Sequence, residues 1–292
     1  MSEQVIGVIG GSGLYQIEGL EGTEWVTVET PFGAPSDQYL VGHVQVGERT
    51  AKLVFLPRHG RGHRFTPSEV NYRANIYGMK KLGVEWLISV SAVGSLREDI
   101  VPGHLVIVDQ FIDKTHGRKG TFFGEGIVGH VAFADPVCKE LADALYDAAK
   151  EVGAIVHKGG TYVLMEGPAF STRAESLLHR SWGASVIGMT NLPVAKLARE
   201  AEIAYATVAL ATDYDCWHPD HDHVTVEAVI KTLTQNVATA RAVLRAVLAK
   251  IPREVPGYVA NALQHAIMTD PSTIPAQARA RLGLLVDRHL QK

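Results

Sequence analysis

Apolar residues along the chain fall into two patterns that alternate for most of its length. Short, continuously apolar runs rich in β-branched residues are typical of strands covered on both faces of a sheet. Longer stretches with apolar residues three and four positions apart are typical of amphipathic helices. The first pattern predicts strands at residues 4–9, 52–56, 84–91, 105–108, 161–165, 184–187 and 203–210.

Helix ends are marked by capping residues, prolines and glycines. Asp135 followed by Pro136 predicts an N-cap and a first helical position, and Gly153 predicts the end of that helix. Pro67 predicts the start of another helix, which Gly83 ends.

Two more helices are predicted towards the C-terminus. A single apolar stripe from Thr225 to about residue 250 predicts one long amphipathic helix, and residues 276–290 carry a second helical pattern. A glycine-rich stretch, residues 114–130, is too long for a simple connection and predicts a functional or interface loop.

Strands that alternate with helices predict an α/β sandwich. We expect a single domain at residues 1–250, in which helices flank a central mixed, mostly parallel sheet. Residues 251–292 are expected to form a C-terminal helical extension.

Charge and composition exclude several classes of function. The 292 residues include 28 Lys and Arg against 31 Asp and Glu, and there is no basic block. Nucleic-acid binding needs clustered cations, so a nucleic-acid surface is excluded. The first basic residue is Arg49 and no apolar run approaches the roughly 18 residues of a membrane span, so we expect neither a targeting peptide nor membrane attachment. Two cysteines, Cys138 and Cys216, are too few for a disulfide framework, and a soluble cytoplasmic protein is expected.

Polar segments follow several predicted strands at their carboxyl ends, where open α/β sheets bind ligands. After the first strand, the N–H groups of residues 10–13 and the Ser12 hydroxyl can bind an anion, although the segment can equally be a tight turn. It is neither a Walker A loop nor a dinucleotide fingerprint. In residues 57–64, Arg58 can bind an oxyanion bidentately and His59 can donate a further hydrogen bond; a solvated basic loop is the alternative.

Two other strand ends offer small polar groups. Ser91 and Ala92 end one predicted strand, and Met189 and Thr190 follow another. Taken singly, each pair can be an ordinary strand exit.

Two acidic residues, Asp213 and Asp215, follow the strand predicted at residues 203–210. Their mutual repulsion can keep one protonated near neutral pH, as a general acid needs. They could instead bind a hard metal ion or cap the next segment. Residues 218–223 hold three histidines and two aspartates, but this run contains a proline and lacks a zinc-site spacing. We expect a polar loop there and no metal.

Together these segments resemble the S-methyl-5′-thioadenosine phosphorylases, a trimeric class of the purine nucleoside phosphorylase family. The resemblance covers roughly residues 5–250 and consists of long matches in a fixed order. They are IGGSGL at 9–14, TPFG at 30–33, RHGR at 58–61, GSLRE at 94–98, DQFID at 109–113, EGP at 166–168, FSTRAE at 170–175 and ATDYDCW at 211–217.

The resemblance implies that phosphate attacks C1′ of a 5′-methylthio nucleoside and releases adenine and 5-methylthioribose 1-phosphate. Phosphate is a co-substrate and no cofactor is implied. Most members of the class carry threonine where Ser12 and Ser91 stand, but the hydroxyl is kept. The implied phosphate ligands are Ser12, Arg58, His59, Ser91, Ala92 and Thr190. The implied nucleoside contacts are Phe170, Ser171, Met189, Asp213, Tyr214, Asp215, Val226 and Val229.

In this reaction we expect Asp213 to be the catalytic residue that donates a proton or a hydrogen bond to purine N7. Asp215 would raise the proton affinity of Asp213. The related 6-oxopurine enzymes carry Glu where Ser171 stands and Asn where Asp213 stands. An aspartate can accept from the adenine N6 amino group, and Ser171 places no carboxylate against the N1 lone pair. A 6-aminopurine is therefore favoured.

The 5′ end of the substrate gives a second test of specificity. In the 6-oxopurine enzymes a histidine aligns with Val226, and an apolar residue there suits a methylthio group, although it can equally be a core position. The resemblance also implies a homotrimer in which His130 completes the site of a neighbouring subunit. In the family, apolar residues of the neighbouring subunit's C-terminal tail also complete the site, and the resemblance implies that residues 251–292 cover the active site although they depart from the family pattern.

Three other functions remain open at this point. A methylthioinosine or broad purine nucleoside phosphorylase is the runner-up. A hydrolase would leave the phosphate ligands unused, and a catalytically silent nucleoside sensor would bind without turnover.

Overall fold

A computed structural model describes residues 3–219 and 225–290. Its central element is one mixed sheet of eleven strands, in which six strand pairings are parallel and four antiparallel. The main path through the sheet runs β2 (Leu20–Val26), β3 (Tyr39–Val46), β4 (Arg49–Pro57), β1 (Gln4–Gly10), β5 (Trp86–Ser95), β10 (Val186–Gly188), β9 (Thr161–Leu164) and β7 (Gln110–Asp113). Off this path, β11 (Ala204–Asp213) pairs with β5 and with β6 (Leu105–Ile107), which pairs with β8 (Val156–Lys158).

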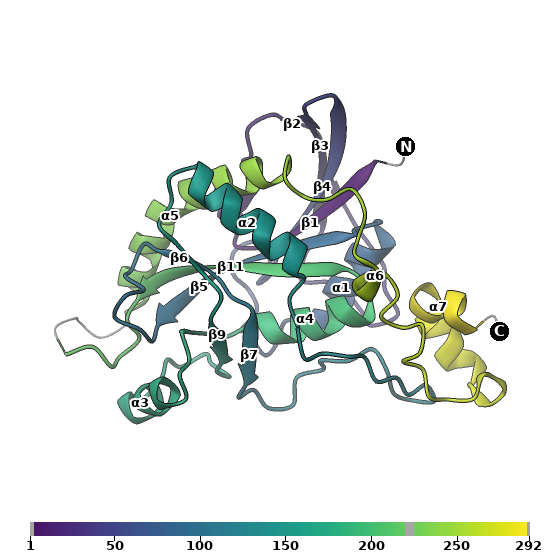
Figure 1. Ribbon diagram of the computed structural model, residues 1–292. Helices are drawn as coiled ribbons and strands as arrows, with labels where there is room; N and C mark the ends of the chain where they lie inside the picture. Colours follow the sequence, from purple (N-terminus) through teal and green to yellow (C-terminus); the bar gives the residue numbers. More distant parts are fainter. Residues whose placement is uncertain (1–2, 220–224, 291–292) are drawn as a thin grey trace.

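Helices cover both faces of this sheet (Figure 1). On one face lie α2 (Lys139–Glu151) and α5 (Val226–Val247), and on the other lie α1 (Tyr72–Lys81) and α4 (Asn191–Glu200). The strands serve both layers because successive side chains point to opposite faces. In β4, Val54 and Leu56 belong to the core under α1 and α4, whereas Leu53 and Phe55 belong to the core under α2 and α5. The predicted α/β sandwich with a mostly parallel sheet is confirmed.

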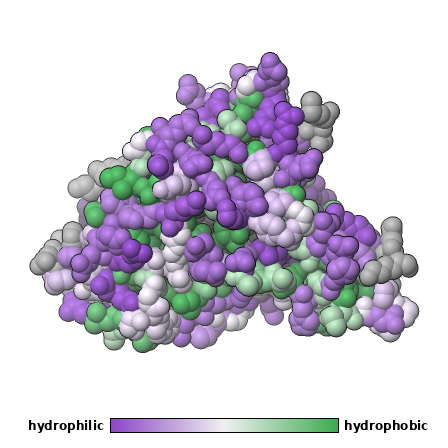
Figure 2. Space-filling view, viewed as in Figure 1, coloured by the Kyte–Doolittle hydropathy of each residue, from purple (hydrophilic) through white to green (hydrophobic). Residues whose placement is uncertain are grey.

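The remaining elements are short or peripheral. They are η1 (Ser12–Leu14), α3 (Arg173–Ser181), α6 (Gly257–Ala260), η2 (Pro271–Thr273) and α7 (Ala276–Leu290). The surface in Figure 2 is mainly hydrophilic, with apolar atoms in small groups. None of the helices within the described ranges is long and apolar enough to cross a membrane.

All seven predicted strands are present with shifted ends, and four strands were missed. β7 and β8 have only four and three residues, and β2 is rich in exposed polar positions at the end of the sheet. β3 was missed although most of its residues are buried.

Two predicted helix starts are wrong. Helix α1 begins at Tyr72 rather than Pro67, because the Asn71 side chain caps it by accepting from the Ala74 N–H at 3.2 Å. Helix α2 begins at Lys139 rather than Pro136. The Cys138 N–H donates to the Tyr205 carbonyl at 2.7 Å, so the chain before it runs beside β11 instead of entering the helix.

The two predicted C-terminal helices are confirmed as α5 and α7. The apolar stripe of α5 leaves the core at its start, since Val226 and Ile230 are exposed while Leu244 and Val247 are buried. In the extension, Leu282 and Val286 join the core under α1 and α4. Within the chain the extension is tied to Glu202, whose carboxylate accepts from the Leu263 N–H at 3.0 Å. Its expected role as a cover for the active site stays a prediction.

Candidate active site

The sheet splits at β5, and the split brings the candidate residues together. On one side β5 pairs with β1 as far as Ser89 and then, from Gly94 onwards, with the antiparallel β10. Residues 90–93 between them have no strand partner on that side within the described chain. The carboxyl ends of β1 and β4 reach this gap from one direction, and that of β10 reaches it from the other. Ser91 and Ala92 therefore lie between the segments that carry Ser12, Arg58 and Thr190.

Arg58 is the buried cation of this gap, with only 4% of its surface exposed. One terminal nitrogen, Nη2, donates to Ser89 Oγ at 2.6 Å and to the Ile9 and Val90 carbonyls at 3.3 Å each. Burial lowers the pKa of the guanidinium, yet an arginine stays protonated in proteins. Its Nε is buried without a partner among the described residues. A buried donor of this kind calls for an acceptor, and a bound oxyanion would provide one.

The hydrogen bonding of His59 differs from the expectation that its ring donates a hydrogen bond to the anion. Its Nδ1 lies 2.8 Å from the Phe65 carbonyl, which can only accept, so Nδ1 carries the proton. Burial, with the charge of Arg58 second, lowers the pKa of His59 to about 4. The ring is therefore neutral at pH 7, and its Nε2 is an acceptor. It can accept a hydrogen bond from the hydroxyl of a hydrogenphosphate.

A buried polar network that the sequence did not reveal lies behind Arg58. Ser89 and Ser91 both donate to Asn191 Oδ1, at 3.1 and 3.2 Å. The Asn191 amide donates in turn to Thr207 Oγ1 at 2.7 Å. Because Ser91 donates inward, its hydroxyl must turn before it can donate to an anion. Asn191 could not be found by reading strand ends, since it lies inside the start of α4 and acts on residues about a hundred positions away.

The other expected phosphate ligands are small groups at the same gap. Thr190 is buried and forms the N-cap of α4 without a side-chain capping bond. Ser12 begins η1, and its side chain lies outside the described part of the structure. Gly10 precedes this turn, and a Cβ there would lie 2.5 Å from Leu14 Cδ1, so the glycine is needed for close packing.

Asp213 ends β11 opposite Gly94 of β5. Its Oδ1 accepts from the Asp215 N–H at 2.8 Å and its Oδ2 from the Thr212 hydroxyl at 2.7 Å. Burial is the main cause that raises the pKa of Asp213 to about 6, and the charge of Asp215 raises it further. Burial is thus a larger cause than the charge of Asp215, and the role of Asp215 in the proton affinity of Asp213 stays a prediction.

Asp215 sits in a left-handed conformation with φ 52° and is buried. Burial raises its pKa, while the nearby Ser176 and Ser171 hydroxyls and the charge of His179 oppose the rise. Asp215 Oδ2, Ser176 Oγ and His179 Nδ1 are buried without a hydrogen-bond partner among the described residues. Ser176 and His179 were missed by the sequence reading. Their spacing of three, in the residues directly after the FSTRAE match, was the available signal.

The other expected nucleoside contacts surround these acids to different degrees. Ser171 is joined to the acidic segment because its carbonyl accepts from Cys216 Sγ at 3.3 Å. Phe170 is exposed, which leaves its ring available to a ligand. The Tyr214 hydroxyl donates to the Glu98 carbonyl at 3.2 Å, so this side chain supports the loop. Met189 Sδ lies against Gly167, where a Cβ would approach it to 2.5 Å.

Among the described residues, no hydrogen bond joins the last three expected contacts to the gap. Val226 is 63% exposed at the first position of α5, and Val229 follows it one turn later. His130 is exposed, and its N–H donates to the Ala266 carbonyl of the C-terminal extension at 2.9 Å.

Metal binding at residues 218–223 falls mostly outside the described residues, which end at 219 and resume at 225. Elsewhere, the described residues contain no group of three potential ligands that could hold a metal ion.

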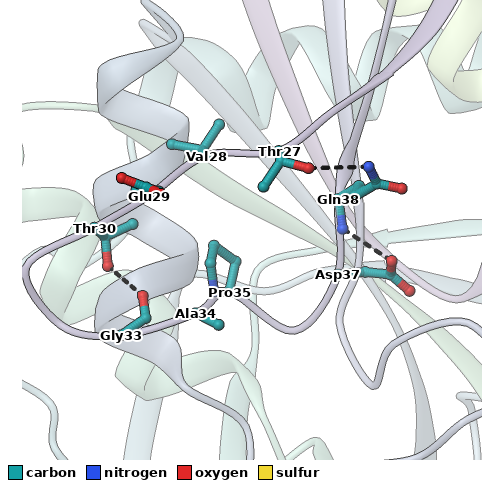
Figure 3. Close-up of a pocket in the computed structure, with 9 residues that line it drawn as sticks. All are labelled: Thr27, Val28, Glu29, Thr30, Gly33, Ala34, Pro35, Asp37 and Gln38. Atoms are coloured by element: carbon teal, nitrogen blue, oxygen red, sulfur yellow. Dashed lines mark hydrogen bonds between the residues drawn. The ribbon is translucent and has the colours of Figure 1, made fainter.

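A separate hollow of about 390 Å³ lies at the segment between β2 and β3 (Figure 3). Several of its polar side chains are already engaged: Gln38 Nε2 donates to Thr27 Oγ1 at 3.0 Å, and Thr30 Oγ1 donates to the Gly33 carbonyl at 2.6 Å. It contains none of the candidate catalytic residues.

Comparisons with known proteins place the chain in a family. The model of the phosphorylase superfamily matches residues 5–249. The S-methyl-5′-thioadenosine phosphorylase of Geobacter sulfurreducens is 62% identical over 289 residues, which cover 99% of this chain and 100% of that protein. A methylthioadenosine phosphorylase from an antarctic soil metagenomic library has a TM-score of 0.91 and 48% identity, covering 98% of this chain and 100% of that one. The Schistosoma mansoni methylthioadenosine phosphorylase in complex with adenine has a TM-score of 0.81 and 38% identity, covering 89% and 96%. The chain therefore belongs to the phosphorylase superfamily, among the S-methyl-5′-thioadenosine phosphorylases.

Proposed function

We propose that this chain catalyses the phosphorolysis of S-methyl-5′-thioadenosine. A phosphate oxygen bonds to C1′ as the C1′–N9 bond breaks, and the products are adenine and 5-methylthio-α-D-ribose 1-phosphate. The observation that carries the proposal is that a buried cation and a half-buried acid lie near the split of the sheet. Arg58 offers an unpartnered Nε, and Asp213 has a pKa raised to about 6.

Phosphate binding follows from the groups at the gap. Arg58 supplies charge and the free Nε donor, and the neutral His59 ring accepts from the phosphate hydroxyl. The anion held there would stabilise the positive charge that develops on the sugar in the transition state. Inorganic phosphate is thus a co-substrate, and the reaction needs no cofactor.

The departing purine takes the electron pair of the broken bond and needs a proton. Asp213 is the group suited to deliver it to N7, because a carboxylic acid with a pKa near 6 keeps a protonated fraction near neutral pH. The carboxylate left behind keeps two donors, the Thr212 hydroxyl and the Asp215 N–H.

Adenine is the base that these residues favour. Asp215 Oδ2 is an unpartnered acceptor suited to the N6 amino group. Ser171 beside it adds no negative charge that would repel the N1 lone pair of adenine. At the 5′ end, the exposed Val226 offers an apolar contact for the methylthio group.

We also propose a homotrimer located in the cytoplasm. The exposed His130 lies on the glycine-rich segment, which is joined to the C-terminal extension by the Gly129–Ile267 bridge. This leaves both segments available to complete a neighbouring subunit's site.

The test is release of purine from methylthioadenosine, methylthioinosine, adenosine and inosine, each with and without phosphate. We expect release from methylthioadenosine only with phosphate. Equal release without phosphate would indicate a hydrolase, a preference for methylthioinosine would indicate the runner-up phosphorylase, and tight binding without turnover would indicate a sensor.

A further inference from the structure

The Arg118 side chain links the glycine-rich segment 114–130 to the gap in the sheet. Although Gly117 and Lys119 on either side are exposed, the Arg118 side chain itself is 2% exposed. A buried guanidinium is unfavourable unless its donors are satisfied, so its partners indicate why it lies there.

Its donors are satisfied by groups from three other segments. Nε donates to the Glu166 carboxylate at 3.2 Å, and Nη2 donates to the Glu166 carbonyl and to Ser68 Oγ, the latter at 3.2 Å. Nη1 donates to the Met189 carbonyl and lies 3.4 Å from the Tyr72 hydroxyl. Because every guanidinium nitrogen is engaged and Glu166 balances the charge, Arg118 does not serve as a direct phosphate ligand.

The hydrogen bond from Arg118 to the Met189 carbonyl sets the orientation of the peptide group between Met189 and Thr190. In a trans peptide the carbonyl and the following N–H point in opposite directions. Holding the Met189 carbonyl towards Arg118 therefore aims the Thr190 N–H away from it. Thr190 is still outside the helical conformation, with φ −134° and ψ −16°, so the helix that follows does not by itself fix this peptide.

The contacts between Arg118 and Glu166 help to fix the position of the Met189 side chain. The Glu166 carbonyl belongs to the peptide that enters Gly167, and the Gly167 Cα faces Met189 Sδ so closely that a Cβ would approach it to 2.5 Å. Arg118 thus holds the backbone on both sides of the Met189 thioether.

Hydrogen bonds other than those of Arg118 also hold segment 114–130 against the rest of the protein. Its beginning is held by the Thr115 N–H, which donates to Asp113 Oδ1 at 3.0 Å. Further along, the Phe122 N–H and the Thr121 hydroxyl each donate to the Glu200 carboxylate at 2.7 Å.

We infer that Arg118 is a positioning residue for the reaction, which fixes the expected nucleoside contact Met189 and the Thr190 N–H relative to each other. The inference rests on the proposed function. Lysine could not replace it, because one ammonium group cannot reach the carbonyls of Glu166 and Met189 and the Glu166 carboxylate with the geometry of a planar guanidinium.

The experiment compares Arg118→Ala, Arg118→Lys and wild type in phosphate-dependent turnover of methylthioadenosine. We expect kcat to fall about 100-fold in both variants, the loss associated with an ångström-scale misplacement of reacting groups. Added guanidinium ion should restore part of the activity of Arg118→Ala and none of that of Arg118→Lys. A residue that only stabilised the fold would not show such recovery.

The matched control is Arg49→Ala, because Arg49 also donates through Nη2 to a backbone carbonyl, that of Leu248 at 3.2 Å, but at the start of β4, the end of the strand opposite Arg58. It should keep nearly wild-type kcat. The inference is overturned if Arg118→Ala keeps wild-type kcat, if Arg49→Ala loses as much, or if folded Arg118→Ala shows no recovery with guanidinium. If Arg118→Ala fails to fold, Arg118→Lys decides: a folded protein with reduced kcat supports the inference, and wild-type kcat or a failure to fold overturns it. Absence of turnover in wild type would instead refute the proposed function.

Discussion

Asp213 and Asp215 show how two identical side chains acquire different roles from their surroundings. Asp213 has donors on both carboxylate oxygens, whereas Asp215 Oδ2 is buried with no hydrogen-bond partner in the part of the chain that the structure describes. The sequence predicted that one acid would have a raised pKa. It could not predict that burial would be the main cause, because burial depends on β5 and α3, which are distant in the chain.

A pH profile tests the assignment of Asp213 as the acid. Because its pKa is raised from 3.8 to about 6, the protonated form predominates below about pH 6 and is lost as pH rises. We expect kcat/KM for methylthioadenosine to fall about tenfold per pH unit well above pH 6, since this parameter follows the ionisation of the free enzyme. In Asp213→Asn this alkaline limb should disappear and kcat/KM should be low throughout. The same limb in Asp213→Asn would assign the ionisation to another group.

The sequence predicts only those site residues whose place along the chain marks them. Arg58 and Asp213 could be found because each follows a strand end. Arg118 and Asn191 could not, because their partners lie far away in sequence and become neighbours only through the sheet order.

At the scale of elements, α3 carries the groups beside Asp215. Its first turn is fixed by a capping box, in which Thr172 Oγ1 accepts from the Glu175 N–H at 3.2 Å and the Glu175 carboxylate accepts from the Thr172 N–H at 2.8 Å. Ser176 and His179 follow one and two turns later, so the cap sets where they lie.

Thr172→Ala should therefore affect both stability and base binding. Loss of the cap should lower the free energy of unfolding by about 1 kcal/mol in urea titrations, and adenine should bind more weakly while phosphate binding is unchanged. The control is Asp270→Ala, which removes the cap of η2 in the extension, where Asp270 Oδ1 accepts from the Ser272 N–H at 2.9 Å. It should leave adenine affinity intact. Equal adenine affinity in Thr172→Ala and wild type would contradict the role given to α3.

Elements were predictable where the pattern was strong and local. The long helix α5 and the C-terminal helix α7 carry repeated apolar spacing, and the buried strands carry continuous apolar runs. The start of α2 was misplaced because the hydrogen bond from Cys138 to Tyr205 overrides the local capping signal of Asp135 and Pro136.

At the scale of the whole molecule, the C-terminal extension shares the core of the main domain. The Leu282 side chain is fully buried and packs in the core that also contains residues of α1, α4 and β1, whereas Leu284 on the same helix is 46% exposed. If the extension is part of one cooperative unit, a cavity at Leu282 should weaken the entire fold.

Leu282→Ala should lower the free energy of unfolding by about 3 kcal/mol, in the range observed when a buried leucine is truncated. Leu284→Ala removes the same atoms from an exposed position and should lower it by less than about 1 kcal/mol. Both variants should unfold in a single transition when intrinsic fluorescence and circular dichroism are followed in denaturant. Two separate transitions, or a small effect at Leu282, would show that the extension folds independently of the sheet that carries the active site.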